Sequence, residues 1–184
     1  MRLCFLHGLD SSPQGTKARL LKTHYPDCLI PSLPPEIHER LHMVEQALQE
    51  PSVVIGSSLG GLTALMFAST HPDLVEALLL LAPAVGCRNS SIFTEDQKQI
   101  LESTYVPATI PTLIIAGIRD EVIPLSSIRA LVQRSPDPDR IQLHEVDDDH
   151  NLQQSLGLML ESIEQIRTKL LSSVKNQTSC IAEF

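Results

Sequence analysis

The sequence predicts an α/β protein with a mainly parallel sheet of about six strands and helices on both faces. Its short apolar runs are rich in Leu, Ile and Val throughout, which is typical of strands that are buried on both faces. Segments with helical periodicity separate these runs, as the crossovers of a parallel sheet require. With 184 residues, of which 42% are hydrophobic, the chain is long enough to bury the core of one domain.

Prolines mark several boundaries between these elements. Pro26 ends the first helix, Pro31 closes the second strand, and Pro35 suits the first turn of the next helix. Strands are expected at residues 2–6, 27–30, 52–55, 75–81, 112–117 and 140–146. Helices are expected at residues 14–24, 35–49, 59–70, 126–134 and 152–174.

Residues 83–111 form the longest stretch without a regular pattern. They include a polar segment at 87–90 and a short helix expected at 94–101. A connection of this length often serves as a lid or a substrate-binding loop. We therefore expect one domain over residues 1–174, with 83–111 as such a loop, and a flexible tail at 175–184.

Charge and cysteine usage argue against several classes of partner and cofactor. The net charge of −8 disfavours nucleic acids and anionic membranes, which need a basic surface. No apolar run approaches the roughly 18 residues of a membrane span, and the first residues turn polar too early for a signal peptide. The four cysteines, at positions 4, 28, 87 and 180, lack metal-ligand spacing, so a reduced, cytoplasmic protein is expected.

The segment at 53–61, Val-Val-Ile-Gly-Ser-Ser-Leu-Gly-Gly, carries the main functional signal. Gly56, Ser58 and Gly60 fit the Gly-x-Ser-x-Gly frame of a nucleophile elbow, a sharp turn between a strand and a helix. Small residues two positions before and two positions after the serine let the strand and the helix approach closely. Ser57 competes as the nucleophile but lacks this glycine spacing, and a turn without chemistry is the alternative reading.

A serine nucleophile needs a base, and His150 is our candidate because it follows the last expected strand. Ligands and catalytic groups of parallel sheets gather beyond the carboxyl ends of the strands. His7 is an alternative base, although its place directly before Gly8 better suits a structural role. A helix-capping or solvated role is the other reading for His150.

The group that orients the base should be a carboxylate at another strand end, and Asp120 occupies that position after residues 112–117. Glu121 and the run Asp147-Asp148-Asp149 are rivals, and pairing with Arg119 is the alternative role for Asp120. The chain order Ser58, Asp120, His150 is that of the α/β-hydrolase triad. Two backbone N–H groups should bind the oxyanion, those of Leu9 and Leu59.

These segments together resemble the α/β-hydrolase serine esterases, and more closely the small bacterial YqiA-like (UPF0227) esterases. The resemblance rests on Phe-Leu-His-Gly-Leu-Asp-Ser-Ser-Pro at 5–13, Ile-Pro-Ser-Leu-Pro-Pro at 30–35 and Ile-Gly-Ser-Ser-Leu-Gly-Gly at 55–61. It continues through residues 82–85 and 119–122 to His150. The chain departs from the family at Asp148 and Asp149, where a glycine pair is usual.

The resemblance implies a compact α/β-hydrolase fold without a large cap domain. It implies nucleophile Ser58, acid Asp120 and base His150, with no metal and no organic cofactor. The expected substrate is a small-molecule carboxylic ester, with an acyl-CoA or acyl-protein thioester as the alternative. A non-catalytic binding module of the same fold is a further alternative, and the sequence leaves the oligomeric state open.

Overall fold

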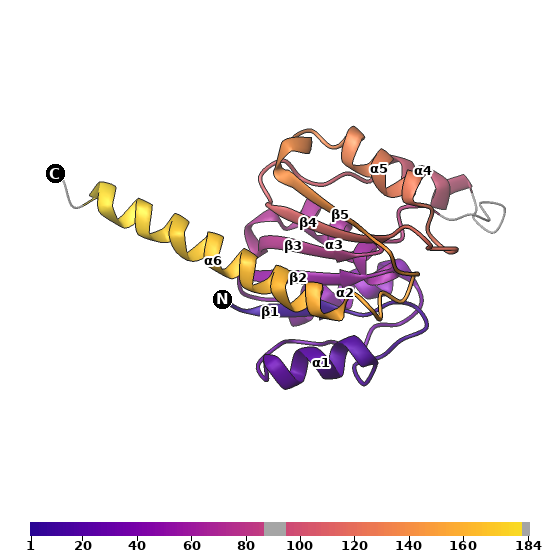
Figure 1. Cartoon of the computed structure of the whole chain (residues 1–184), viewed down its shortest axis with the longest axis horizontal. Coiled ribbons are helices and arrows are strands. Elements are labelled where there is room, and N and C mark those ends of the chain that lie inside the picture. Colours follow the sequence, from indigo (N-terminus) through magenta and orange to yellow (C-terminus); the bar gives the residue numbers. More distant parts are fainter. Residues whose placement is uncertain (87–94, 182–184) are drawn as a thin grey trace.

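The computed structural model describes residues 1–86 and 95–181 of the chain. At its centre is a sheet whose strands lie in the order β1-β2-β3-β4-β5, and all neighbouring strands are parallel (Figure 1). The strands are β1 (Leu3–Leu6), β2 (Ser52–Ser57), β3 (Val75–Leu81), β4 (Thr112–Gly117) and β5 (Ile141–Val146). Because every strand runs the same way, all carboxyl ends meet at one edge of the sheet.

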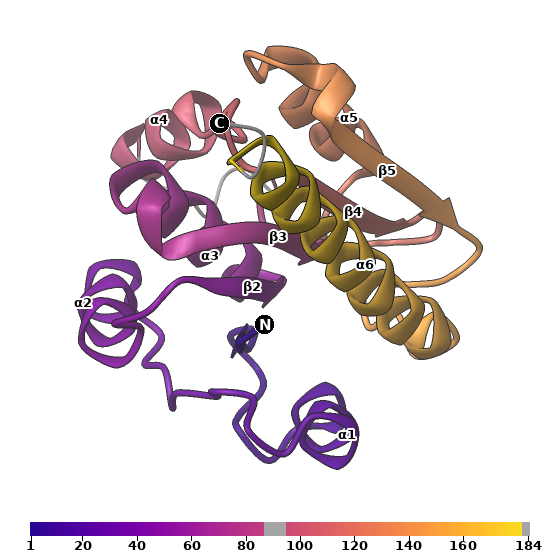
Figure 2. The same ribbon diagram turned by 90° about the vertical axis from the view of Figure 1, so that its left-hand side faces the viewer.

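Helices cover both faces of this sheet, as expected (Figure 2). In chain order they are α1 (Thr16–His24), α2 (Ile37–Ala47), α3 (Leu59–Thr70), α4 (Glu95–Ser103), α5 (Leu125–Arg134) and α6 (Leu156–Ile181). Short 3₁₀ turns, η1 (Pro72–Leu74) and η3 (Pro138–Arg140), lead into β3 and β5. In the described residues no helix has both the length and the apolar character needed to cross a membrane.

The core consists of two apolar layers, one on each face of the sheet. Successive strand side chains alternate between them: Leu78 and Leu80 of β3 pack with α2, α3 and α5, whereas Leu79 packs with α1 and α6. All three side chains are fully buried. Burial of a leucine side chain is worth about 1.5–3 kcal/mol, so the central strands anchor the fold.

The expected second strand, at residues 27–30, is reduced to a single bridge. Leu29 pairs in parallel with Cys4, outside the edge of β1. Its carbonyl accepts a hydrogen bond from Phe5 N at 2.8 Å, and its N–H donates to Leu3 O at 2.8 Å. Pro26 and Pro31 flank this segment, and neither has an N–H that could extend the pairing. The sheet therefore contains five strands.

The later half of the chain differs from expectation mainly at helix ends. α6 begins at Leu156 rather than 152, because Leu152 has a left-handed φ of 52° and belongs to a turn. The polar segment at 87–90 lies outside the described residues. α6 extends to Ile181 and projects beyond the sheet (Figure 1), and residues 182–184 are not described. We retain one domain over 1–174 with a C-terminal tail as a proposal.

Cys4 and Cys28 are free and buried, Cys28 in the apolar layer that contains α1 and Cys4 in the layer on the opposite face of the sheet. Burial raises the pKa of the Cys4 thiol to about 12 and that of the Cys28 thiol to about 11. Thiols react as thiolates, so these two cysteines are expected to be inert in the folded protein.

The turn from β2 into α3 requires glycine at two positions. A Cβ on Gly56 would lie 2.5 Å from Gly60 O and 2.7 Å from Gly61 Cα. A Cβ on Gly60 would overlap the Leu6 carbonyl, at the end of β1. The backbones of β1, β2 and α3 therefore meet at distances that leave no room for a side chain, as the spacing of Gly56 and Gly60 predicts.

Gly60→Ala should accordingly destabilise the protein by about 3 kcal/mol or more, because the added methyl meets rigid backbone on a neighbouring strand. Urea unfolding monitored by circular dichroism measures this loss. Gly157→Ala in α6 is the matched control, since a Cβ there meets nothing within 4 Å. The control should be neutral or gain up to about 1 kcal/mol. Equal stability of both variants would contradict the close approach.

Candidate active site

Ser58 occupies the turn between β2 and α3 in a strained backbone conformation, with φ 54° and ψ −119°. Left-handed backbone costs a non-glycine residue roughly 1–2 kcal/mol and persists where surrounding contacts hold it. Ser58 N donates to Leu81 O at 2.9 Å, and its carbonyl accepts from Ala84 N at 3.0 Å. These bonds to the end of β3 fix the turn and orient the serine hydroxyl.

His150 lies beside that hydroxyl. Its Nε2 is 2.9 Å from Ser58 Oγ, although the two residues are 92 positions apart in the chain. Its Nδ1 is 2.8 Å from Asp120 Oδ2. The structure therefore brings together the three side chains singled out in the sequence, each from the loop after a different strand: β2, β4 and β5.

Asp120 is almost completely buried, with 2% of its surface exposed. Its Oδ1 accepts hydrogen bonds from Val122 N and Ile123 N, both at 2.8 Å, while Oδ2 faces His150. Burial alone would raise the pKa of this carboxyl. The bonds from His150, Ile123 and Val122 and the charge of His150 outweigh burial and hold the pKa below its ordinary value. Asp120 is therefore ionised at neutral pH.

The ionised carboxylate determines the protonation of the neighbouring imidazole. A carboxylate only accepts hydrogen bonds, so His150 Nδ1 must carry a hydrogen and donate it to Asp120. In the neutral ring Nε2 is then an acceptor, and the Ser58 hydroxyl donates to it. This arrangement can pass the serine proton to the imidazole, and the carboxylate stabilises the cation that results.

The turn that carries His150 is organised around the buried carboxylate of Asp148. This carboxylate accepts bonds from Asp149 N at 2.8 Å, Gln154 N at 2.9 Å and Ser155 Oγ at 2.9 Å. Burial would raise its pKa, but these bonds dominate and lower it. Asp148, which stands where the resembled family has glycine, thus fixes the turn between β5 and α6 from inside.

The loops of Asp120 and His150 are also tied directly to each other. Arg119 N donates to Asp148 O at 3.1 Å, and the Arg119 guanidinium pairs with the Asp147 carboxylate at 2.7 Å. A Cβ on Gly117 would lie 2.5 Å from Asp148 O, so the end of β4 touches the histidine turn. These contacts set the distance between the carboxylate and the imidazole.

The rival residues have other surroundings. Asp147 pairs with Arg119, Asp149 Oδ1 accepts from Asn151 N at 2.8 Å, and Glu121 is exposed. Arg119 thus pairs with Asp147 rather than with Asp120. Ser57 is the last residue of β2, one position before the turn.

His7 has both ring nitrogens engaged with backbone. Nδ1 donates to Gly8 O at 2.8 Å, and Nε2 accepts from Leu33 N at 3.1 Å. Burial lowers the pKa of His7, with the charge of Arg40 acting in the same direction and the bond to Gly8 opposing it. A neutral imidazole with both nitrogens occupied suits a structural brace rather than a base.

The loop that His7 braces passes directly over Ser58. A Cβ on Gly8 would lie 3.2 Å from Ser58 Cβ, so the next N–H groups of this loop are close to the serine. Leu59, the first residue of α3, has an N–H without an intrahelical partner. Within the described residues neither Leu9 N–H nor Leu59 N–H donates a hydrogen bond. Both remain available to a negatively charged oxygen.

A cleft of about 890 Å³ opens over these groups. Its wall is largely apolar, with contributions from α3, from the loop after β4 and from Ile100 and Leu101 of α4. Ala84 and Gly86 line the cleft as well, and the role of 83–111 as a lid or substrate-binding loop stays a prediction. The apolar lining residues include Phe5, Leu9, Leu62, Ile100, Leu101, Val122 and Ile123.

Three residues near the site were not found from the sequence. For Asp148 the sequence suggests only a rival to Asp120 as the orienting carboxylate, and not the role of holding the turn. Lys17 donates to Asn151 O at 2.6 Å, next to His150, and lines the cleft. Arg40 is completely buried under the loop after β1. For Arg40 a signal existed, because it lies four residues before Val44 on the apolar face of its helix.

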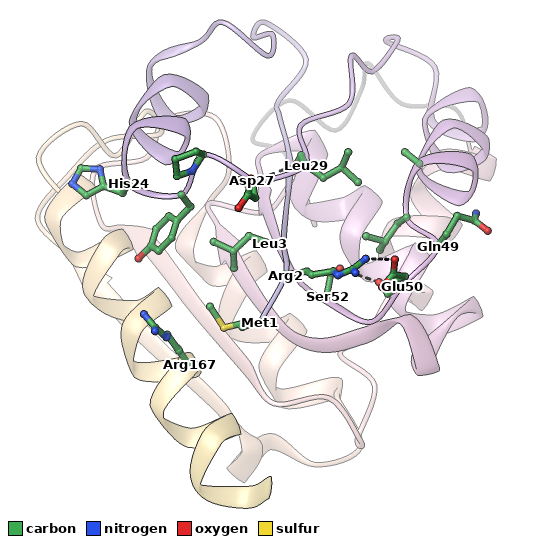
Figure 3. A pocket seen from close by; sticks show the side chains of 15 residues that line it. Met1, Arg2, Leu3, His24, Asp27, Leu29, Gln49, Glu50, Ser52 and Arg167 are labelled. Carbon is green, nitrogen blue, oxygen red and sulfur yellow. Dashed lines mark hydrogen bonds and ion pairs between the residues drawn. The ribbon is translucent and has the colours of Figure 1, made fainter.

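A second hollow of about 770 Å³ lies at the opposite end of β1 (Figure 3). Arg2 and Glu50 form an ion pair across its floor, and His24 and Arg167 line its other side. It contains no serine–histidine pair like that of the cleft. Among residues 1–86 and 95–181 no cluster of His, Cys, Asp and Glu side chains could hold a metal ion.

Comparison with known proteins agrees with this geometry. The model of the Esterase family, described as "Putative esterase", matches residues 12–109, just over half of the chain. The mitochondrial palmitoyl-protein thioesterase ABHD10 of Rattus norvegicus is 25% identical over 167 residues. That match covers 71% of this chain but only 56% of the relative, so the chain spans little more than half of its length.

Solved structures show the same fold. The mouse alpha/beta hydrolase domain-containing protein 10 superposes with a TM-score of 0.77 at 19% identity, over 92% of this chain and 90% of the other. Est1E from Butyrivibrio proteoclasticus gives a TM-score of 0.71 at 16% identity, over 93% and 88%. The five-stranded parallel sheet with helices on both faces is therefore an α/β-hydrolase fold, and residues 1–86 and 95–181 form no large cap.

The bonds around Asp148 predict a specific loss of stability. Asp148→Asn should destabilise the protein by about 1–3 kcal/mol, because the amide nitrogen cannot accept the bonds that the second carboxylate oxygen receives. Asp147→Asn is the control: its side chain is 79% exposed, and its pair with Arg119 should be worth less than about 1 kcal/mol. Urea unfolding at pH 7 compares the two variants.

The same comparison has a defined pH dependence. The pKa of Asp148 is lower in the folded protein than its value of about 3.9 in the unfolded chain. The ionised carboxylate therefore stabilises the folded protein fully above about pH 3.9, and this stabilisation is lost as the pH falls through the lower folded pKa. The difference between wild type and Asp148→Asn should thus be constant from pH 7 to about 5 and shrink below about pH 4. A difference that grew on acidification would contradict the role of the ionised carboxylate.

Proposed function

The chain belongs to the Esterase family of α/β hydrolases, enzymes that hydrolyse esters, and we propose that it cleaves its substrate through an acyl-enzyme on Ser58. The observation that carries this proposal is the contact of His150 Nε2 with Ser58 Oγ at 2.9 Å. The other ring nitrogen of His150, Nδ1, lies 2.8 Å from Asp120 Oδ2. Nucleophile, base and orienting carboxylate are the groups that acyl transfer requires.

In the proposed mechanism the Ser58 hydroxyl attacks the acyl carbonyl while His150 removes its proton. The N–H groups of Leu9 and Leu59 bind the oxyanion of the tetrahedral intermediate. The imidazolium, stabilised by Asp120, then protonates the leaving group, and the carbonyl re-forms as the acyl-enzyme. Water attacks this ester with the same proton transfers, releasing the acid and regenerating the serine.

The positions of the polar groups support this sequence of steps. The depressed pKa of Asp120 keeps the carboxylate charged, so it can stabilise the imidazolium at neutral pH. The largely apolar cleft suits an acyl chain or another small apolar group beside the serine. We propose a small-molecule ester as the substrate, and the small bacterial YqiA-like esterases as the subfamily, from the segments they share with this chain.

The alternative substrate is an acyl thioester. The matched rat relative is named a palmitoyl-protein thioesterase, and a thiol leaves the same tetrahedral intermediate without any change in the triad. We propose a cytoplasmic location, because Cys4 and Cys28 are free thiols, whereas the rat relative is named as mitochondrial.

Ser58→Ala should lower hydrolysis of p-nitrophenyl esters by at least about a thousandfold, because no other group can form the acyl-enzyme. Thermal unfolding should be unaffected, and a fluorophosphonate should label Ser58 in wild type but not in the variant. Ser57→Ala is the control and should keep most of the activity and the labelling. Undiminished activity in purified Ser58→Ala, or an adduct mapped to Ser57, would overturn the assignment.

Matched substrates distinguish the two leaving groups. An ester and a thioester with the same acyl chain are hydrolysed by the wild type under identical conditions, and kcat/KM is compared. We expect measurable turnover of both with a preference for the ester. A kcat/KM about tenfold or more higher for the thioester would instead favour the thioesterase function. Absence of turnover and of labelling would favour a non-catalytic binding module.

A further inference from the structure

Arg40 is the largest side chain that is completely buried in the described part of the protein. It belongs to α2, and no carboxylate among the described residues forms an ion pair with it. Burial lowers the pKa of its guanidinium to about 10, which still leaves it charged at neutral pH. An unpaired buried charge is costly, so its hydrogen bonds must compensate.

Those hydrogen bonds reach three separate segments. Nη1 donates to Pro34 O at 2.9 Å, Nη2 donates to His7 O, and Nε donates to Thr63 Oγ1 at 3.0 Å. The planar guanidinium presents its N–H groups in a fixed fork, so it holds the three acceptors in one relative geometry. Arg40 thus fastens α2 simultaneously to the loop after β1 and to α3.

Both of these segments supply an N–H group to the oxyanion site. On one side, His7 O lies in the peptide that leads into Gly8 and Leu9. On the other, Thr63 Oγ1 accepts from Arg40 and donates in turn to Leu59 O at 2.8 Å. One guanidinium therefore connects, directly and through one hydroxyl, to the backbone next to each of the two donors.

His7 completes this network from the other side of the loop. Its Nδ1–H holds Gly8 O, and its Nε2 holds Leu33 N, next to the carbonyl of Pro34 that Arg40 binds. The charge of Arg40 helps to keep His7 neutral, so Nε2 stays an acceptor. Hydrogen bonds from Arg40 and His7 therefore hold the loop after β1 in place, even though Leu9 in this loop is exposed.

We propose that Arg40 is a positioning residue that sets the distance between the Leu9 and Leu59 N–H groups, and so the ability of the site to bind an oxyanion. The proposal rests on the proposed serine mechanism, in which these groups stabilise the tetrahedral intermediate. Arg40 touches neither substrate nor reacting atoms, and its effect is transmitted through His7 O and Thr63.

The role predicts a selective effect on transition-state binding. Arg40→Met should lower kcat for p-nitrophenyl butyrate by about tenfold to a hundredfold, somewhat less than the loss of a whole oxyanion donor. KM should change by less than about threefold, because the ground-state ester makes little use of the hole. Arg40→Lys keeps the charge without the fork and should fall between Arg40→Met and wild type.

Inhibition by a boronic acid separates a change at the oxyanion site from a general loss of stability. Butylboronic acid forms a tetrahedral adduct with a reactive serine and directs an oxygen toward the oxyanion site. Its inhibition constant should rise in Arg40→Met by about the same factor as kcat falls, since both report the tetrahedral state. Leu48→Ala, which removes a buried side chain just after α2, is the control for general destabilisation and should leave both values unchanged.

Thr63→Val and Thr63→Ser keep the test decisive if Arg40→Met does not fold. Valine removes the hydroxyl link to Leu59 and should lower kcat and boronate affinity together, whereas serine preserves the link and should restore both. Folded variants with kcat and inhibition constant within about twofold of wild type would overturn the proposal. A wild type that is neither labelled at Ser58 nor active would instead overturn the serine mechanism itself.

Discussion

The close approach of three backbone segments around Ser58 is the constraint on which the rest of the structure depends. Gly60 lies so near the carbonyls of Leu6 and His7 that the first turn of α3 rests directly on the end of β1. The same turn forces Ser58 to a φ of 54° and leaves its hydroxyl at the carboxyl edge of the sheet. This contact thereby determines how α3 leaves β2 and brings the serine next to the loop after β1.

The remaining chemistry depends on polar side chains, most of them buried, that hold loops in place. Asp148 organises the turn of His150, and Arg119 ties that turn to the loop of Asp120. On the other side of Ser58, Arg40 and His7 fasten the loop after β1. The buried members, Asp148, Arg40 and His7, have hydrogen-bond partners on backbone or on hydroxyl side chains, which is the condition under which burial of a polar group is tolerated.

Much of this arrangement could be predicted from local sequence. The apolar runs locate all five strands, and the spacing of Gly56 and Gly60 identifies the turn, because both signals arise from short-range sterics and burial. The strand-end rule points to Asp120 and His150, because a parallel sheet brings the carboxyl ends of its strands to one edge. The roles of Asp148 and Arg40 could not be predicted, since their partners lie in segments brought near only by the fold. Residues 27–30 read as a strand, yet flanking prolines leave a single bridge.

In the proposed mechanism the turn at Ser58 and the loop after β1 together form an oxyanion site beside the serine. A crystal structure of the protein with Ser58 phosphonylated by an alkyl fluorophosphonate tests it most directly. We expect a phosphoryl oxygen within about 2.7–3.1 Å of both Leu9 N and Leu59 N, with His150 still hydrogen-bonded to Asp120. A phosphoryl oxygen that points to solvent, or that binds other donors, would contradict it.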